Sequence, residues 1–246
     1  MEISGLRYLH QRGLTEETIR EADLMFFKDG KLYFDKHIRN PKVLGNIKSI
    51  FEFKTSKGDY HYRERFDNSI LIPVYDAYGS YAATMARRLE PGVRAKFDST
   101  PYEKRYLLYQ MNRAALHILE ENSVFVVEGI WDALMMRQFG IKNTVAANSC
   151  RLSPEQIHLC GRFTNQFNIL FDPDKAGKIG AEKTGNEIKK QGYEYRIITL
   201  NKPVDLDTYL LSFGVPEEIL CLKSQSGSKN TPPLMNCKID SGTSCR

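Results

Sequence analysis

Carboxylates follow two short apolar runs in the second half of the chain, and this pattern constrains the fold more than any other feature. Residues 124–127 are followed by Glu128, and residues 168–171 are followed by Asp172 and Asp174. Uninterrupted apolar runs of this length are typical of strands buried on both faces of a parallel sheet. Because the carboxyl ends of parallel strands lie at one edge of the sheet, we expect these three carboxylates to lie near one another.

Carboxylates gathered at one edge repel one another, and a hard divalent cation relieves that repulsion. Oxygen ligands suit Mg²⁺ or Mn²⁺. A second acidic pair, Asp205 and Asp207, follows a largely apolar run at 195–200. The pattern therefore predicts metal-assisted phosphoryl chemistry, with Asp172, Asp174 and one or both of Asp205 and Asp207 as candidate metal ligands.

Acidic residues that follow strands have a simpler interpretation as helix N-caps, which need no metal. For Asp132 or Asp207 alone, capping is the favoured interpretation. For Glu128, Asp172 and Asp174 together, the metal site is favoured, because three separate coincidences would otherwise fall at matching strand ends.

The composition is that of an ordinary globular protein with a mild positive charge. The 246 residues are 41% hydrophobic and carry a formal net charge of +5, which fits one large domain or two small ones. No stretch approaches the roughly 20 apolar residues that cross a bilayer, and the first residues lack a signal-peptide pattern. The five cysteines show no paired spacing, so reduced thiols in a bacterial or phage-infected cytoplasm, away from membranes, are expected.

Basic residues are concentrated in the first half of the chain, where few acidic residues oppose them. A field of this sign suits a polyanion, although such residues also commonly form a solvated surface. The residues are Lys36, Arg39, Lys42, Lys48, Lys54, Lys57, Arg63, Arg65, Arg87, Arg88, Arg94, Lys96, Lys104, Arg105 and Arg113.

The first half reads as a mixed segment of short helices and strands. One helix is expected to stop at Gly13, and Thr15 is expected to cap the next helix. Strands are expected at 32–34, at 60–66 and, as a hairpin around a turn at 76–79, at 70–75 and 81–89.

From residue 123 onward strands and helices alternate, which predicts a parallel sheet. The predicted fold class is α/β, with an α+β basic subdomain over 1–121, a parallel α/β domain over 122–222, and a tail from 223 to 246 that we expect to be disordered. The expected strands are 124–127, 144–147, 168–171 and 196–200, and the expected helices are 131–139, 154–159, 176–191 and 206–213.

The order of the acidic motifs resembles the Toprim domain, the metal-binding α/β module of bacterial-type primases, topoisomerases, recombination-repair factors and some nucleases. The resemblance covers about residues 123–214, and the combination of motifs is specific where each alone is weak. The matching stretches are Glu128-Gly129, then Asp172-Pro173-Asp174 with Ala176-Gly177, then Asp205-Leu206-Asp207.

The first half resembles the catalytic core of DnaG-type DNA primases. Residues 8–19 are similar to the opening of that core, and residues 70–79 are similar to a strand and turn that lead to an arginine, here Arg87. Lys96-Phe97 and Lys104, which precedes Leu108-Tyr109, match two further basic positions. The resemblance extends over nearly all of residues 8–214 in the family's order.

This resemblance implies a DNA-directed RNA polymerase that makes short RNA primers on single-stranded DNA from ribonucleoside triphosphates. It implies a two-metal site that holds Mg²⁺ or Mn²⁺, in which Glu128 is either a ligand or the group that assists deprotonation of the attacking hydroxyl. The implied metal ligands are Glu128, Asp172, Asp174, Asp205 and Asp207.

The resemblance also implies that Arg87, Lys96 and Lys104 bind the nucleotide triphosphate or the template backbone. Nearby aromatic residues have two interpretations, as platforms for base stacking or as core. Core is the favoured interpretation for Phe97, Tyr106, Tyr109 and Trp131.

The sequence departs from the family pattern in several places. Pro173 stands where the family usually has glycine, and Ala147-Asn148-Ser149 stands where it has Leu-Gly-Thr. The zinc-ribbon and helicase modules of the family are not recognised, so a separate zinc-binding module and a replicative helicase are candidate partners. A core stripped down in this way is typical of a phage or plasmid gene.

Two other functions stay open on the sequence alone. A Toprim hydrolase uses the same carboxylates to cleave a phosphodiester, and a non-catalytic replication accessory protein keeps only the basic surface. The long basic first half favours polymerisation over hydrolysis, and the intact acidic set favours catalysis over an accessory role.

Overall fold

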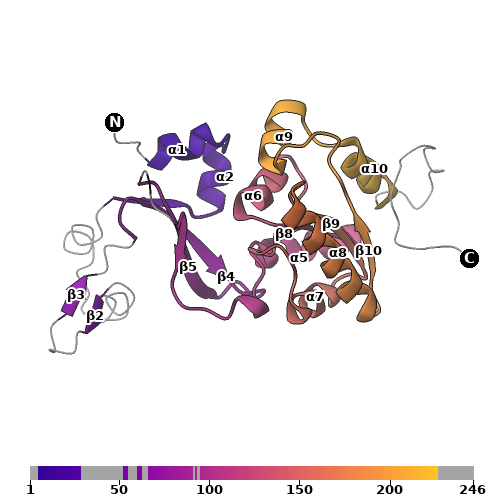
Figure 1. Ribbon diagram of the computed structural model, residues 1–246, viewed down its shortest axis with the longest axis horizontal. Helices are drawn as coiled ribbons and strands as arrows, with labels where there is room; N and C mark the ends of the chain where they lie inside the picture. Colours follow the sequence, from indigo (N-terminus) through magenta and orange to yellow (C-terminus); the bar gives the residue numbers. More distant parts are fainter. Residues whose placement is uncertain are drawn as a thin grey trace, which may run out of the picture. The chain divides into compact units, whose positions relative to one another are not determined.

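A computed structural model describes residues 5–28, 52–54, 60–62, 66–90, 92 and 95–226 (Figure 1). The chain divides into two compact units. The first comprises residues 1–74 and 82–102, and the second comprises residues 75–81 and 103–246. The predicted domain boundary after residue 121 stays a prediction.

The first unit is built on an antiparallel sheet with the strand order β1-β4-β5-β6. Two short helices precede the sheet, and a separate antiparallel pair, β2 and β3, lies between β1 and β4 in the sequence. The elements are α1 (Gly5–Gln11), α2 (Glu16–Glu21), β1 (Met25–Phe27), β2 (Glu52–Lys54), β3 (Tyr60–Tyr62), β4 (Ser69–Tyr75), β5 (Tyr81–Arg88) and β6 (Phe97–Ser99).

Local signals in this part of the sequence are confirmed. Gly13 has a φ of 81° just after α1, a conformation that glycine adopts without strain. The Thr15 hydroxyl accepts a hydrogen bond from the Thr18 amide at 3.2 Å and so caps α2. The predicted hairpin is β4 and β5, whose turn is held by the Asp76 carboxylate. The strand expected at 32–34 lies outside the described residues.

The second unit is built on a parallel sheet with the strand order β10-β9-β7-β8. The predicted alternation of strands and helices is confirmed. The elements are the 3₁₀ helix η2 (Lys104–Tyr106), α5 (Met111–Glu121), β7 (Val124–Val127), α6 (Ile130–Gln138), β8 (Thr144–Ala146), α7 (Pro154–Gly161), β9 (Gln166–Leu170), α8 (Lys175–Lys190), β10 (Glu194–Ile197), α9 (Leu206–Phe213) and α10 (Glu217–Ser226).

Strand β7 is the centre of the second unit because all four of its residues are buried. Successive side chains of a strand point to opposite faces of a sheet. Val124 and Val126 accordingly join one core cluster with residues of α5, α7 and α8. The helices α6 and α9 contact each other, and α6 also contacts β8. Such double covering explains why β7 is apolar at every position.

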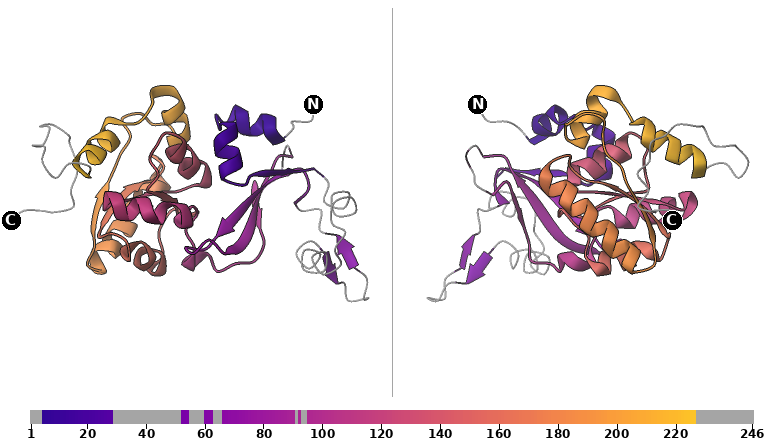
Figure 2. Two further views of the ribbon diagram at one scale, coloured as in Figure 1. Left: turned by 180° about the vertical axis from the view of Figure 1, so that it is seen from behind. Right: turned by 45° about the vertical axis from the view of Figure 1, so that its right-hand side comes forward.

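Helix α8 lies against the sheet (Figure 2). Most of the buried residues of this helix are small. A Cβ atom at Gly185 would overlap the ring of Tyr195 on β10, so glycine at this position permits the close approach. Helix α10 extends to Ser226, so the first residues of the expected disordered tail are helical, and residues 227–246 lie outside the described part. No helix within the described residues is long and apolar enough to cross a membrane.

Truncation of the core between α5 and the sheet is expected to destabilise the second unit. Ile118 is fully buried on α5, whereas Leu116 on the same helix is 72% exposed. Ile118→Ala is expected to lower the free energy of unfolding by about 2–5 kcal/mol, because it removes buried methyl groups and leaves a cavity. Urea titration is the measurement, with Leu116→Ala as the control. Equal effects of the two substitutions would contradict the described orientation of α5.

Candidate active site

Two carboxylates project from neighbouring strand ends of the parallel sheet. Glu128 directly follows β7, and Asp172 follows β9 after one intervening residue. The two strands are paired so that Val127 lies opposite Leu170. Glu128 and Asp172 are both partly buried. The sequence-based prediction that these strand ends lie side by side is therefore confirmed by the strand register.

The electrostatics of the site connect Glu128 and Asp172 to the three other predicted acidic residues. Burial raises the pKa of Glu128, and the negative charges of Asp172, Asp174 and Asp205 raise it further, while a hydrogen bond from the Asp172 backbone lowers it. Burial also raises the pKa of Asp172, and Asp205, Asp174 and Asp207 add to that effect. Asp174, Asp205 and Asp207 are therefore each close enough to Glu128 or Asp172 to raise the pKa of that carboxyl.

The side chains are near one another without forming a finished coordination sphere. Within the described residues, no three His, Cys, Asp or Glu side chains are gathered closely enough to hold one metal ion. Two acidic residues are also engaged in helix capping. Asp174 is the N-cap of α8 and accepts from the Gly177 amide at 2.7 Å, and Asp132 accepts from the Gly129 amide at 3.0 Å.

Capping and cation binding are compatible for Asp174, because a carboxylate has two oxygens and the cap uses Oδ1. Asp205 is the N-cap residue of α9 and makes no side-chain capping bond. Asp207 accepts from the amide of Thr208 at 2.7 Å in the first turn of the same helix. The interpretation of Asp132 as a capping residue is confirmed.

Gly177 positions Asp172. A Cβ atom at this glycine would overlap the carbonyl oxygen of Asp172, so the backbone of Asp172 lies directly against the first turn of α8. The Ala-Gly that follows the two aspartates in the sequence thus has a steric reason. It allows the loop after β9 to approach the helix and fixes where the Asp172 side chain begins.

The donor set fits a hard divalent cation. All five candidate ligands are carboxylates, which suit Mg²⁺- or Mn²⁺-type ions. Glu128 Oε2 is buried and has no hydrogen-bond partner among the described residues. A buried carboxylate oxygen without a partner costs free energy, and a cation at this position would offset that cost.

The predicted basic residues are divided between the two units. Arg87 and Lys96 belong to the first unit, and Lys104 belongs to the second. Arg87 on β5 donates from Nε to the Tyr8 hydroxyl at 3.0 Å, and its guanidinium lies over the rings of Tyr8 and Phe97 at 5.8 and 5.2 Å. These contacts hold Arg87 in one orientation. Lys96 and Lys104 are exposed.

The four aromatic residues that are predicted to belong to the core differ in their exposure to solvent. Tyr109 is 3% exposed and Trp131 is 8% exposed, so the prediction that they belong to the core is confirmed. The same prediction is wrong for Phe97 and Tyr106, which are 38% and 48% exposed. An arginine lies over each of these two rings, Arg87 over Phe97 and Arg105 over Tyr106.

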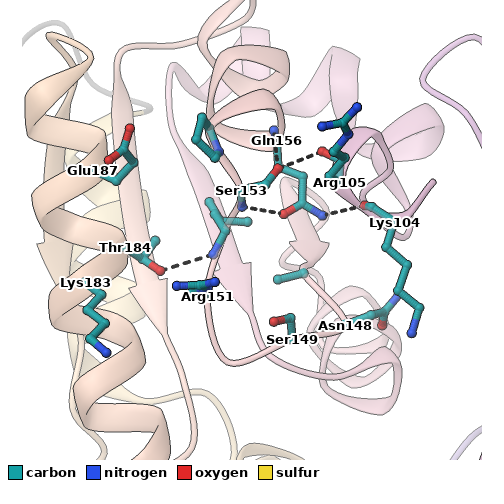
Figure 3. Close-up of a pocket in the computed structure, with 13 residues that line it drawn as sticks. Lys104, Arg105, Asn148, Ser149, Arg151, Ser153, Gln156, Lys183, Thr184 and Glu187 are labelled. Carbon is teal, nitrogen blue, oxygen red and sulfur yellow. Dashed lines mark hydrogen bonds between the residues drawn. The ribbon is translucent and has the colours of Figure 1, made fainter.

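A pocket of about 520 Å³ lies within the second unit, between η2, the loop after β8, and helices α7 and α8 (Figure 3). The sequence did not indicate it, because its lining comes from separated segments. Asn148 lies in the loop with a φ of 53°, a left-handed conformation that asparagine tolerates better than most residues. This explains how the chain manages without a glycine in its Ala147-Asn148-Ser149 stretch. The lining includes Lys104, Asn148, Ser149, Arg151, Lys183 and Glu187.

Two family models match the chain, one in each half. The model described as DNA primase catalytic core, N-terminal domain, matches residues 1–115. The model described as Toprim-like matches residues 125–210.

Two curated relatives of the chain are DNA primases. The DNA primase of Staphylococcus epidermidis is 27% identical over 215 residues, and that of Staphylococcus aureus is 28% identical over 217 residues. Each alignment covers 85% of this chain and 36% of the relative. The chain therefore spans about a third of the length of the curated relatives it matches.

Three solved structures of primases have a similar fold. The Aquifex aeolicus primase (zinc binding and RNA polymerase domains) has a TM-score of 0.78 at 25% identity, covering 89% of this chain and 55% of that one. A DnaG primase catalytic domain bound to ssDNA has a TM-score of 0.72 at 25% identity, covering 89% and 73%. A DNA primase domain from Pseudomonas aeruginosa has a TM-score of 0.74 at 25% identity, covering 89% and 70%.

A parallel sheet with carboxylates after two adjacent strands, preceded by an antiparallel sheet, defines a protein of the Toprim class with a primase-type first half. More particularly, the chain belongs to the family of DnaG-type DNA primase catalytic cores. The predicted α/β fold class is confirmed. Membership of this family implies a divalent-metal site, and the carboxylate edge of the second unit fits one.

Gly177→Ala tests the steric positioning of Asp172. Alanine favours a helix over glycine by about 1 kcal/mol, whereas overpacking costs about 1–3 kcal/mol. We expect a net loss of stability and a weaker affinity for Mn²⁺, measured by thermal unfolding and calorimetry. Asn186→Ala, at an exposed position of α8, is the control and is expected to be neutral or slightly stabilising. An unchanged Mn²⁺ affinity in Gly177→Ala would contradict the positioning role.

Asp172→Asn tests the charge crowding. In EDTA at neutral pH the substitution is expected to stabilise the protein by about 1 kcal/mol or less, because it removes a partly buried, repelled charge that solvent partly screens. A raised carboxyl pKa means that the folded state binds the proton more tightly than the unfolded state. The stability difference is therefore full above the raised pKa and disappears as the pH falls below the ordinary Asp value.

Thermal unfolding as a function of pH measures this difference, with Glu182→Gln on the exposed side of α8 as the control. Added Mg²⁺ is expected to reverse the order of stability, because a ligand that binds only the folded state stabilises it. Destabilisation by Asp172→Asn in EDTA would contradict the crowding.

Proposed function

We propose that this chain synthesises short RNA primers on single-stranded DNA by metal-dependent nucleotidyl transfer. The observation that carries the proposal is the set of mutually repelling carboxylates at the ends of β7 and β9, within a DnaG-type core. The likeness to curated DNA primases supports the same reaction.

In this reaction the 3′-hydroxyl oxygen of one nucleotide attacks the α-phosphorus of the next. A new phosphorus–oxygen bond forms, the bond to pyrophosphate breaks, and the hydroxyl proton leaves. The barrier is mostly positioning and charge, so the protein needs cations and fixed geometry more than a nucleophile. Bound Mg²⁺ or Mn²⁺, most simply as a pair, would supply Lewis-acid stabilisation of the attacking and leaving oxygens.

The position of each carboxylate suggests its role in binding the cations or accepting the proton. Asp172 is fixed by its close approach to Gly177, and Asp174 is fixed by its cap on α8, so both would hold cations in a constant place. Asp205 and Asp207 lie at the start of α9 and would complete the ligand set. The buried Oε2 of Glu128 has no hydrogen-bond partner among the described residues. Two roles fit this residue: it would be a metal ligand, or it would accept the hydroxyl proton.

The basic residues would act on the substrates. Arg87 is braced by Tyr8 and Phe97, which suits a guanidinium that contacts a phosphate in one orientation. Lys96 and Lys104 would bind the template backbone or the triphosphate as exposed point charges.

Two solved relatives support part of the partner set. One solved relative is bound to ssDNA, and another includes a zinc-binding domain. We propose a single-stranded DNA template, ribonucleoside triphosphates, a zinc-binding module and a replicative helicase as partners of this chain in the cytoplasm. We further propose a phage or plasmid as its source.

A primer-synthesis assay tests the proposal. The full chain is incubated with single-stranded DNA, labelled ribonucleotides and Mg²⁺ or Mn²⁺, and short RNA is expected. Asp172→Ala is expected to lower its yield by about a hundredfold or more, the loss typical for removal of a central electrostatic group. Glu182→Ala is the control and is expected to retain activity.

Each other outcome identifies a different protein. Degradation of the template that depends on Asp172 would identify a Toprim nuclease and contradict the primase proposal. Binding to DNA with neither synthesis nor cleavage would identify an accessory protein.

A further inference from the structure

The second unit also contains a pocket with a largely basic lining, distinct from the carboxylate edge. Its cationic lining residues are Lys104, Arg105, Arg151 and Lys183, and its acidic lining residue is Glu187. The guanidinium of Arg105 lies over Tyr106 and is 3.6 and 3.7 Å from the carboxylates of Glu103 and Glu155. Arg105 is therefore already engaged with acidic side chains, and the other cations of the lining are Lys104, Arg151 and Lys183.

Arg151 and Lys183 make no ion pair within the part of the chain that the structure describes. Figure 3 shows them on two different walls of the pocket, Arg151 in the loop after β8 and Lys183 on α8. Cations that approach one cavity from separate elements repel one another, and an anionic ligand offsets that repulsion.

Hydrogen bonds within the protein hold one side of the pocket in place. Gln156 is buried, and its Nε2 donates to the carbonyl oxygens of Lys104 at 3.1 Å and Leu107 at 2.7 Å. The Ser153 hydroxyl donates to the carbonyl oxygen of Arg105 at 2.7 Å. These bonds tie η2 to the start of α7 and fix the backbone from which the Lys104 side chain extends.

Helix α8 connects the pocket to the carboxylate edge. Along this helix, Gly177 lies against the backbone of Asp172, and Gly180 lies against the backbone of Cys150. One turn further on, the Thr184 hydroxyl accepts a hydrogen bond from the Leu152 amide at 3.2 Å. Gly177 and Thr184 are two helical turns apart, which is about 10 Å along the axis. A second link comes from the pocket residue Ala147, whose amide donates to Val127, the residue before Glu128.

We propose that this pocket binds the 5′-triphosphate of the nucleotide that starts the primer. The inference rests on the proposed function. A primer begun without a pre-existing strand needs a first nucleotide whose 3′-hydroxyl lies at the carboxylates while its triphosphate lies elsewhere. The pocket lies about two helical turns away, has the opposite charge, and its volume of about 520 Å³ accommodates a nucleotide-sized group.

The chemistry of the lining agrees with a polyphosphate. Lys104, Arg151 and Lys183 would pair with phosphate oxygens, and the Ser149 hydroxyl would donate to one of them. No metal is required there, since the cations are supplied by side chains. Arg151 and Lys183 are therefore positioning residues for the first nucleotide, distinct from the acidic residues that would serve the reaction centre.

Calorimetry with inorganic tripolyphosphate in EDTA tests the pocket without any catalysis. The double variant Arg151→Ala/Lys183→Ala is expected to bind tripolyphosphate about tenfold more weakly, the loss expected when charge-assisted hydrogen bonds are removed. Lys189→Ala/Lys190→Ala removes the same charge from exposed positions of the same helix and is the matched control. Asp172→Asn is expected to retain binding. Equal loss in both double variants would overturn the proposal.

A comparison of two starting substrates tests the assignment to the first nucleotide. RNA synthesis begun by a ribonucleoside triphosphate is expected to fall about tenfold in Arg151→Ala/Lys183→Ala, through a raised KM for the starting nucleotide. Synthesis begun by a dinucleotide with a 5′-hydroxyl is expected to match that of the unsubstituted protein, since it brings no triphosphate to the pocket.

The remaining outcomes separate this proposal from the proposed function. Equal losses with both starting substrates would assign the pocket to the template or to the incoming nucleotide and overturn the proposal. If the unsubstituted chain binds tripolyphosphate but makes no RNA from either substrate, the proposed function fails and the assignment to a starting nucleotide fails with it. Unchanged synthesis from both substrates in the double variant would also overturn the proposal that the pocket binds the starting nucleotide.

Discussion

Repulsion among carboxylates at the carboxyl edge of the parallel sheet is the interaction on which the second unit's chemistry depends. Glu128 and Asp172 are partly buried at the ends of β7 and β9, and Asp174, Asp205 and Asp207 add negative charge around them. An arrangement that raises the pKa of its own members is unfavourable by itself. It is stable to the extent that the apolar strands and the packing of α8 hold it together.

Helix α8 supplies much of that support. Its face of small residues lets the Asp172 loop, the loop after β8 and the ring of Tyr195 all lie against one rigid element. The same face sets the spacing between the acidic edge and the basic pocket, because Gly177 and Thr184 are fixed on one helix. Two sites of opposite charge are thereby held at a constant separation, which suits a substrate that carries its reacting hydroxyl and its phosphates at different ends.

Much of the second unit could be predicted from the sequence because its signals are local. The four apolar residues of β7, the acidic residue that follows them and the glycines of α8 lie within short stretches, and the order of strands and helices follows from their alternation. The predicted neighbourhood of Glu128 and Asp172 follows from the parallel pairing of two such strands. The capping role of Asp132 could also be predicted, since it needs only the spacing to Gly129.

The rest depends on contacts between distant segments. The basic pocket combines Lys104, Arg151 and Lys183 from three parts of the chain, and no spacing in the sequence connects them. Phe97 and Tyr106 are exposed and each lies against an arginine, and the presence of an aromatic residue in the sequence reveals neither fact. The spacing of Gly177, Gly180 and Thr184 was a usable signal for a close helix contact, although it does not say what the helix contacts.

Titration with Mn²⁺, followed by electron paramagnetic resonance of the free ion, tests most directly whether the acidic edge is a cation site. The unsubstituted chain is expected to take up Mn²⁺, and Glu128→Gln/Asp172→Asn is expected to take up far less, while Glu182→Gln behaves as the unsubstituted chain does. Equal uptake by all three proteins, or none by the unsubstituted chain, would contradict the assignment of these carboxylates to a metal-dependent active site.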